Sequence, residues 1–323
     1  MSQSINRKVV VIFGGSGFVG NHLIPKLQED GYSVHIADIV PTKNNNVTFH
    51  LCDVRNEIDI ELNEQPDLII NLAAVHRTPG HESDDYFVSN VAGATNIVNW
   101  ATQKNVNDIV FTSSIAVYGP GEDLKDESSP LTPIHAYGKS KLLAENIFLT
   151  WQNENSNRRR ILICRPAVIF GAGEKGNYSR MARALKLGLF LIPGSRNLVK
   201  SSGYVGDLTR SIVFMIKSAK TSETYNFCFP SLLTIGEISS AMASIAEWRK
   251  PFALPLRRIV PVLTRLGYPL SHIGKRIEKL LLPTRIEAAV LKRMGFVWEY
   301  DLQASLNEWY EYSKFDTEVK FEA

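Results

Sequence analysis

The sequence has few cysteines, no long apolar run and no strong excess of either charge. Its 323 residues include Cys52, Cys164 and Cys228, too far apart to form a CxxC motif or a His/Cys cluster. We therefore expect buried thiols in a reducing compartment and no metal site. The formal net charge of +3 is too small to indicate a nucleic-acid partner.

Targeting and membrane segments are also missing from the sequence. Residues 1–8 are polar and lead into a strand-like run, so we expect no signal peptide. No apolar stretch reaches the roughly 18 residues that a membrane-spanning helix needs. With 44% hydrophobic and 21% charged residues, the composition is typical of a globular chain. These features lead us to expect a soluble cytoplasmic protein.

Short apolar segments alternate with helical stretches through the first half of the chain. A helical pattern over 18–30 follows the first of these segments, and this alternation predicts a parallel sheet with helices on both faces. After about residue 170 the pattern loosens, which indicates a smaller C-terminal lobe interleaved with the first domain. The expected strands are 8–13, 33–38, 47–51, 68–72, 108–112 and 161–165.

A glycine-rich turn at 14–20 directly follows the first predicted strand and opens the first predicted helix. In this context Gly14 permits a tight turn, Gly17 lets the backbone approach a pyrophosphate, and Gly20 lets the helix pack on the strand. The helix N-terminus, with Phe18 and Val19, would face the phosphates. We expect a Rossmann-type fold with an NAD-binding domain over 1–170, to which 204–230 returns, and a mainly substrate-binding lobe over 171–323.

Asp38 lies at the end of the second predicted strand. A carboxylate at this place accepts hydrogen bonds from the ribose hydroxyls of the adenosine and repels a 2′-phosphate. The sequence therefore favours NAD over NADP as the cofactor. Asp53 and Val54 follow the third predicted strand, and their position makes them candidate neighbours of the adenine.

Tyr137 and Lys141 are four residues apart in a segment with helical character, for which Thr132 is the expected N-cap and Pro133 a first-turn residue. Residues at this spacing share one helix face, so the ammonium can lie near the phenol. A neighbouring cation would lower the phenol pKa and make the tyrosine an acid and base near neutral pH. Ser114, which ends the fifth predicted strand, can hydrogen-bond the reacting oxygen.

These segments together resemble the extended short-chain dehydrogenases/reductases, specifically the NAD-dependent sugar epimerase/dehydratase family. The resemblance implies that Ser114, Tyr137 and Lys141 form a catalytic triad, and that Lys141 also bonds the nicotinamide ribose. It further implies cofactor contacts from the residues after the fourth and sixth strands, which are Leu72, Ala73, Ala74, Pro166 and Val168. The segments that carry the likeness are GGSGFVG (14–20), NLAA (71–74), NVAGATN (90–96), FTSSIAVYG (111–119), YGKSK (137–141), RPAVIFG (165–171) and YVGDL (204–208).

Sugar dehydratases of this family have an Asp-Glu pair where this chain has Ser114-Ile115, so dehydration is not expected. Epimerisation remains, as does simple oxidation or reduction of a sugar carbon. In the epimerase scheme Tyr137 takes the proton of the C4 hydroxyl while NAD takes the C4 hydride. The keto sugar then turns over in the site and receives the hydride on its other face.

Four residues are candidates for holding the substrate. The resemblance implies that Asn177 and Lys200 meet a diphosphate, although family enzymes often have an arginine in place of Lys200. His76 follows the fourth strand, where ligands collect in such sheets, and Ser114 would contact the sugar. Several segments resemble bacterial 4-epimerases acting on N-acetylglucosaminyl-diphospho-undecaprenol, so the expected substrate is GlcNAc or GalNAc on undecaprenyl diphosphate or UDP, in surface-polysaccharide (O-antigen) synthesis. UDP-galactose 4-epimerases of this family have an asparagine near the substrate at the position of Val168, so the resemblance does not favour a UDP-galactose substrate.

The segment 249–293 carries a local charge of +9, while the rest of the chain carries −6. Apolar residues are interleaved with these charges, so the segment could lie on an anionic membrane surface. It could equally be a lobe helix with a solvated basic face or a lid over the diphosphate. Four prolines in it argue against one long helix. The family resemblance also implies a homodimer that pairs through helices near 84–103 and 135–151.

Two other readings stay open at this stage. A net redox enzyme, either a keto-sugar reductase or a hydroxysteroid-type dehydrogenase, would use the same triad but would consume added NAD(P)H. A non-catalytic dinucleotide sensor would keep the fold, but such proteins usually lose the tyrosine or the lysine, and this chain has both.

Overall fold

The computed structural model describes residues 7–42, 44–75, 82–254 and 282–317. The candidate substrate residue His76 lies outside the described residues, as does most of the basic segment 249–293. None of the helices within the described ranges is long and apolar enough to cross a membrane.

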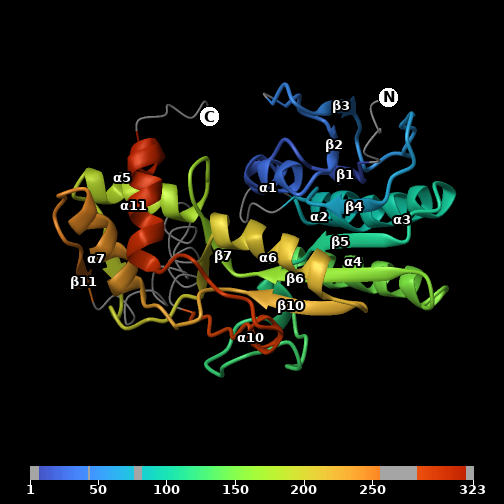
Figure 1. Ribbon diagram of the computed structural model, residues 1–323. Coiled ribbons are helices and arrows are strands. Elements are labelled where there is room, and N and C mark those ends of the chain that lie inside the picture. The colour runs from blue at the N-terminus through green and yellow to red at the C-terminus, as the bar shows by residue number, and fades with distance from the viewer. Residues whose placement is uncertain (1–6, 43, 76–81, 255–281, 318–323) are drawn as a thin grey trace.

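The centre of the molecule is a sheet of seven parallel strands (Figure 1). The strand order is β10-β6-β5-β4-β1-β2-β3. The chain adds β2 and β3 on one side of β1 and then crosses over to add β4 and the later strands on the other side. All six strands expected from the sequence are present, and the predicted Rossmann-type fold is confirmed. The strands are β1 Val9–Phe13, β2 Ser33–Asp38, β3 Thr48–Leu51, β4 Leu68–Asn71, β5 Asp108–Thr112, β6 Arg160–Pro166 and β10 Glu223–Phe227.

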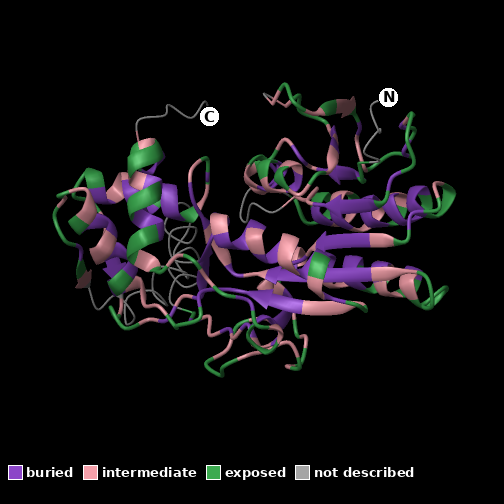
Figure 2. Ribbon diagram, in the orientation of Figure 1, coloured by how far each residue is buried: buried purple, intermediate pink, exposed green. Residues whose placement is uncertain are grey.

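Helices cover both faces of this sheet because its central strands are apolar on both sides. Helices α1 (Phe18–Glu29) and α6 (Val205–Ser218) share one hydrophobic core with one face. Helices α3 (Gly93–Gln103) and α4 (Ala136–Asn153) share a second core with the other face. Figure 2 shows the strands buried between these layers. The carboxyl ends of all seven strands therefore meet at one edge of the sheet, and the strand order reverses between β1 and β4, the place where such sheets usually bind ligands.

A smaller lobe lies beyond that edge, on the left in Figure 1. Its own core is formed by α5 (Asn177–Lys186), α7 (Ile235–Ile245) and α11 (Leu302–Ser313). Two short parallel pairs flank these helices, β7 (Val168–Phe170) with β9 (Ser202–Tyr204), and β8 (Leu191–Pro193) with β11 (Phe252–Leu254). Helix α10 (Ala289–Met294) packs beside β10.

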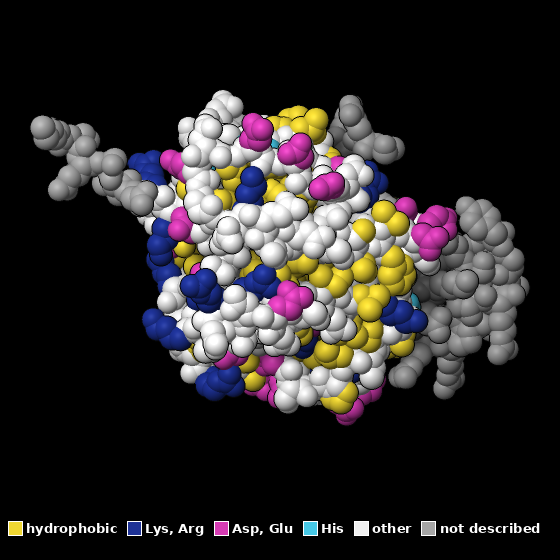
Figure 3. All heavy atoms as spheres, turned by 90° about the vertical axis from the view of Figure 1, so that its right-hand side faces the viewer, with side chains coloured by type: hydrophobic (Ala, Val, Ile, Leu, Met, Phe, Trp, Pro, Cys, Tyr) yellow, Lys and Arg dark blue, Asp and Glu magenta, His cyan; other side chains and the backbone are white. Residues whose placement is uncertain are grey.

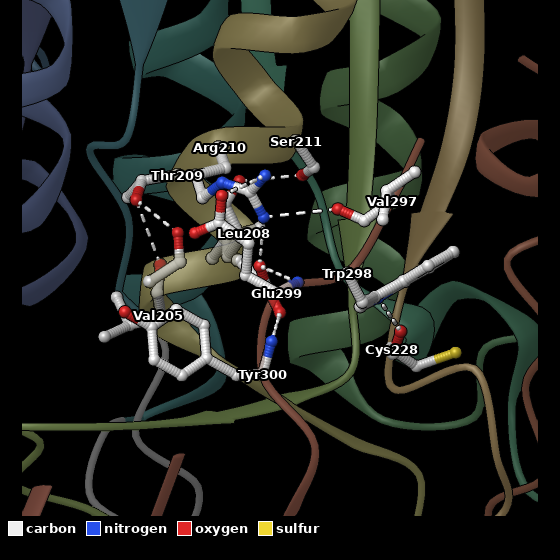
Figure 4. A network of polar contacts seen from close by, with 12 residues as sticks. Val205, Leu208, Thr209, Arg210, Ser211, Cys228, Val297, Trp298, Glu299 and Tyr300 are labelled. Carbon is white, nitrogen blue, oxygen red and sulfur yellow. Dashed lines mark hydrogen bonds and ion pairs between the residues drawn. The ribbon is translucent and has the colours of Figure 1, made fainter. Parts of the chain in front are cut away.

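A buried carboxylate fastens the C-terminal part of the chain to α6. Asp207 accepts hydrogen bonds from the backbone amides of Glu299 and Tyr300, both at 3.1 Å, and forms an ion pair of 2.6 Å with Arg210. Arg210 also reaches Glu299 and the carbonyl of Val297 (Figure 4). This network gives the YVGDL segment a structural role, because its aspartate links α6 to the C-terminal part of the chain.

Two helix predictions were wrong in detail. The expected helix over 84–103 is divided into α2 (Ser83–Phe87), the π-helical turn η1 (Val88–Ala92) and α3. The N-cap of α4 is His135 instead of Thr132, whose hydroxyl donates to the carbonyl of Tyr118 at 2.9 Å. In both places a contact distant in sequence outweighs the local helix signal.

Candidate active site

The glycine turn lies directly against the segment that follows β4. Gly14 has a φ of +76°, and a Cβ added there would lie 2.5 Å from the backbone nitrogen of Ala73. A Cβ at Gly20 would overlap the carbonyl oxygen of Gly15, so α1 packs on the turn at backbone distance. Helix α1 begins at Phe18 with Gly17 as its N-cap and no side-chain cap, so the first amides of the helix have no partner within the helix and can bind an anion.

Asp38 closes this turn from the end of β2. Its carboxylate accepts hydrogen bonds from the backbone amides of Ser16 at 3.0 Å and Val40 at 3.1 Å. The Ser16 hydroxyl is buried and has no hydrogen-bond partner within the part of the chain that the structure describes. A glycine cradle, open helix amides, an orphaned hydroxyl and an adjacent carboxylate fit the adenosine and pyrophosphate of a dinucleotide.

We expect Asp38→Ala to weaken NAD binding more than NADP binding. The substitution removes the acceptor for the ribose hydroxyls and the charge that repels a 2′-phosphate, so the NAD preference should fall by at least about tenfold. Dissociation constants for both cofactors, measured by fluorescence titration of the wild type and the variant, check this. Equal losses for the two cofactors would show that Asp38 does not meet the ribose.

The expected neighbours of the adenine have contacts of their own. Asp53 forms an ion pair of 2.6 Å with Arg55, and this hydrogen-bonded partner lowers the pKa of the carboxyl. The carbonyl of Val54 accepts a hydrogen bond of 2.8 Å from Asn96 of α3. These contacts hold the segment after β3 in place, and the adenine contact itself stays a prediction.

Ser114 and Tyr137 meet at the carboxyl end of β5. Ser114 is the N-cap of the short 3-10 helix η2 (Ile115–Tyr118), and its oxygen accepts a hydrogen bond of 3.2 Å from the amide of Ala116. Tyr137 lies in the first turn of α4, and its phenol is hydrogen-bonded to Ser114. The ring of Tyr86 lies 6.0 Å from the Tyr137 ring, centroid to centroid.

Lys141 is 2% exposed, and its amine donates a hydrogen bond of 2.7 Å to the carbonyl of Thr112. The amine also lies 4.6 Å from the centre of the Phe111 ring. Burial lowers the pKa of Lys141 to about 7, against the opposing effect of the Glu145 carboxylate. The lysine therefore sits at the border between its charged and neutral forms at neutral pH.

The expectation of a lowered phenol pKa was wrong for this structure. Burial raises the pKa of Tyr137 to about 12, and it outweighs the hydrogen bond to Ser114, which acts in the opposite direction. The lysine directs its proton to the Thr112 carbonyl, and its own pKa is so low that it is only partly charged at pH 7. Helical spacing placed both groups on α4 but did not account for the loss of solvent around them.

The buried lysine leads to a prediction about stability and pH. In the unfolded chain Lys141 has its ordinary pKa of 10.5, so between about pH 7 and 10.5 the unfolded state binds more protons. The contribution of Lys141 to stability therefore rises with pH in this window, by at most about 1.4 kcal/mol per unit. Denaturant titrations should show the wild type gaining stability relative to Lys141→Met over this range. A constant difference would mean that the lysine titrates normally.

Asn90 is a structural residue of the site that the sequence interpretation did not single out. It lies in η1, and its amide group pairs with the backbone of Val75 at 3.0 and 3.2 Å and donates to the Ser140 hydroxyl at 2.9 Å. The wide π-helical turn points this side chain inward, where it links η1 to α4 and to the segment after β4. An asparagine on an otherwise apolar helix face was the available signal.

The candidate diphosphate residues each have a hydrogen-bond partner within the protein. Asn177 is the exposed first residue of α5, and its side-chain oxygen accepts a hydrogen bond of 2.9 Å from Arg180. The amine of Lys200 donates to the carbonyl of Leu282. Pro166 ends β6 and Val168 begins β7, so both lie at the carboxyl edge of the sheet, where the triad also lies.

Comparisons with known proteins agree with this geometry. The sequence model of the NAD dependent epimerase/dehydratase family matches residues 10–228, which include the glycine turn and the triad. An N-acetyl-α-D-glucosaminyl-diphospho-undecaprenol 4-epimerase of Escherichia coli O157:H7 is 29% identical over 315 residues, which cover 94% of each chain. A sterol-4-α-carboxylate 3-dehydrogenase of Saccharomyces cerevisiae is 31% identical over 58% of this chain and 59% of its own length.

Among solved structures, a UDP-glucuronic acid 4-epimerase of Bacillus cereus in complex with NAD is similar with a TM-score of 0.77. It is 18% identical in sequence, and the match covers 96% of this chain and all of the other. The likeness therefore extends through the smaller lobe as well as the sheet.

Proposed function

This chain belongs to the NAD dependent epimerase/dehydratase family, and from that premise we propose that it is a 4-epimerase of a diphosphate-linked amino sugar. The cofactor of the family is the one expected from the sequence, NAD. The observation that carries the proposal is the hydrogen-bonded pair of Ser114 and Tyr137 beside the buried Lys141, at the edge of the sheet that holds the glycine turn. The relative from E. coli supports the choice of epimerisation.

In the proposed reaction, NAD held by these residues would supply a reversible acceptor for the hydride of the sugar C4. Tyr137 takes the proton from the C4 hydroxyl and gives it back to the product, with Ser114 holding the oxygen by a hydrogen bond. The phenol pKa near 12 must fall for this step. In this proposal a protonated Lys141, which shares a helix face with Tyr137, would lower it.

We assign the residues that hold NAD and substrate as follows. The turn at 14–20 with Phe18 and Val19 holds the pyrophosphate, Asp38 the ribose, and 53–54 the adenine. Residues 72–74, Pro166 and Val168 line the nicotinamide side. The sugar and its diphosphate would meet Ser114, His76, Asn177 and Lys200.

The experiment that tests the function compares two substrates. Purified protein is incubated with undecaprenyl-diphospho-GlcNAc or with UDP-GlcNAc, without added reductant, and each sugar is analysed for its C4 epimer. Conversion of the lipid substrate alone is the expected result and would place the enzyme in surface-polysaccharide synthesis, such as that of an O-antigen. Conversion of UDP-GlcNAc alone would retain the epimerase and change the carrier.

A second candidate is a net oxidoreductase, and the sterol dehydrogenase relative favours it. The Ser-Tyr-Lys triad serves hydride transfer in either direction. The two functions differ in their use of NAD, since an epimerase returns the hydride to the same substrate. NADH consumption on addition of a keto sugar or a ketosteroid, with no C4 epimer formed, would replace our proposal by this one.

A lipid-linked substrate would require the enzyme to meet a membrane at the cytoplasmic face, and the smaller lobe has a surface suited to it. Leu187 and Leu189 are both 70% exposed and Phe252 is 59% exposed. The pairing of β8 with β11 brings these segments side by side. Exposed Lys186, Arg249 and Lys250 are adjacent to them in sequence. Apolar side chains rimmed by basic ones are the composition of surfaces that bind anionic lipid.

We expect the wild type to co-sediment with phosphatidylcholine vesicles that contain phosphatidylglycerol. The double variant Leu187→Asp, Leu189→Asp should lose most of this binding, because it places two anions against an anionic surface. Leu51→Asp on β3, at an equally exposed leucine of the other domain, is the matched control. Equal sedimentation of the double variant and the control would exclude this surface.

We also propose that the protein is a homodimer. Exposed Val88 and Leu143 lie on η1 and α4, the elements expected to pair. Figure 3 shows that hydrophobic side chains also gather in a band on the side of the molecule that is on the right in Figure 1. Such a face on two copies can bury itself by a twofold contact. Sedimentation velocity of the wild type and of Leu143→Lys tests this, with a shift toward monomer expected in the variant.

A further inference from the structure

A buried ion pair lies one helical turn from Lys141. Glu145 accepts two hydrogen bonds from Arg165, one from Nε at 2.9 Å and one from Nη2 at 2.7 Å. The two side chains are 1% and 7% exposed. Arg165 also donates through Nη1 to the hydroxyl of Tyr118 at 2.9 Å, and that hydroxyl donates to Asn226 at 2.8 Å. Four side chains thus form one continuous network.

The network joins the elements that carry the proposed site. Glu145 lies on α4, the helix of the proposed acid/base and its lysine. Tyr118 ends η2, which begins directly after Ser114. Arg165 lies near the carboxyl end of β6, and Asn226 lies on β10, which pairs with β6. A displacement of any one element would break hydrogen bonds inside the protein.

Within this network Glu145 acts on the charge of Lys141. The two residues are four apart on α4, and the carboxylate favours the charged form of the lysine while burial disfavours it. The lysine amine stays on the carbonyl of Thr112 at 2.7 Å. Both oxygens of the carboxylate in turn accept hydrogen bonds from Arg165.

Stability alone is a weak reason for such a pair. Replacing a buried ion pair by apolar side chains of similar volume is often neutral or stabilising, because removing two charges from water is costly. An apolar pair would supply no negative charge near the buried Lys141. It would also lack the directional hydrogen bonds that fix α4 against β6. The network is therefore better explained by what it does for the site.

We propose that Glu145 and Arg165, joined to Tyr118, are positioning residues that place a negative charge one helical turn from Lys141 and hold α4, η2 and β6 in their relative places. The inference rests on the function proposed above, in which Lys141 assists Tyr137. It adds three residues to the machinery of the reaction without giving them contact with the substrate.

The test measures the ionisation of Lys141 directly, so it does not depend on the substrate. The full chain is prepared with isotopically labelled lysine, and the Lys141 NMR signal is assigned from its loss in Lys141→Met. In Glu145→Gln the titration midpoint of Lys141 should fall by about one pH unit, because the negative charge is gone. Glu154→Gln is the matched control, since Glu154 follows the same helix and pairs with Arg159 at the surface.

An unchanged midpoint in a folded Glu145→Gln protein would overturn the proposal. Because that variant leaves Arg165 buried without its partner, the double variant Glu145→Gln, Arg165→Met is measured as well, and a lowered midpoint is expected there too. An unchanged midpoint in the double variant would overturn the proposal even if the single variant does not fold. A lowered midpoint together with no epimerised sugar would keep the role of Glu145 and reject the proposed reaction instead.

Discussion

Tyr137→Phe is expected to reduce epimerase turnover by about 10³-fold and to leave the affinity for NAD within a few fold of the wild type. The phenol is the group hydrogen-bonded to Ser114. Removing one oxygen from a buried ring changes the fold little. The loss should therefore appear in turnover, with little change in cofactor binding or melting temperature.

The control for this variant is Tyr178→Phe, which removes another buried phenol from the core of the smaller lobe. It should retain nearly full turnover. Initial rates of C4 epimerisation and NAD titrations of the wild type and both variants provide the measurement. Normal turnover in Tyr137→Phe would remove this residue from the mechanism, and equal losses in both variants would indicate a structural effect.

Gly20→Val is expected to lower the free energy of unfolding by about 3 kcal/mol and to abolish measurable NAD binding. The Cβ of any residue at this position would overlap the carbonyl oxygen of Gly15, which is backbone and cannot turn aside. The start of α1 would have to move away from the turn. Its first amides would then no longer converge where the pyrophosphate is expected.

Gly121→Val serves as the control because a Cβ there meets only the end of the Lys125 side chain, at 3.2 Å. It should stay within about 0.5 kcal/mol of the wild type and bind NAD normally. Urea unfolding and NAD titration of the three proteins test both claims. NAD binding by a folded Gly20→Val protein would show that the helix N-terminus does not hold the cofactor.

The pKa values of Tyr137 and Lys141 depend on contacts between segments that are distant in sequence, and a local sequence pattern does not show such contacts. The spacing of Tyr137 and Lys141 predicted that they share a helix, and both lie on α4. The same spacing predicted a lowered phenol pKa, whereas burial raises it. Desolvation depends on how many atoms from distant segments surround a group, and a sequence read along one helix does not report that.

The start of α4 and the buried charged contacts could not be predicted from the sequence for the same reason. Thr132 has the chemistry of an N-cap, yet its hydroxyl bonds the Tyr118 carbonyl 14 residues before it. Glu145 and Arg165 are 20 residues apart, and only the packing of α4 against β6 makes them partners. Asp207 reaches amides more than 90 residues away, so its role in the YVGDL segment could not be inferred from its neighbours.

The parallel sheet, the glycine turn after its first strand and the family could all be predicted from the sequence, because each depends on short-range patterns. Buried strands need continuous apolar runs, and a tight turn beside a phosphate needs glycine at fixed spacing. The tertiary structure alone decided the protonation of Tyr137 and Lys141, the π-helical turn that carries Asn90 and the ion pair behind the lysine. Each of these depends on burial and on partners far along the chain, which exist only once the chain is folded.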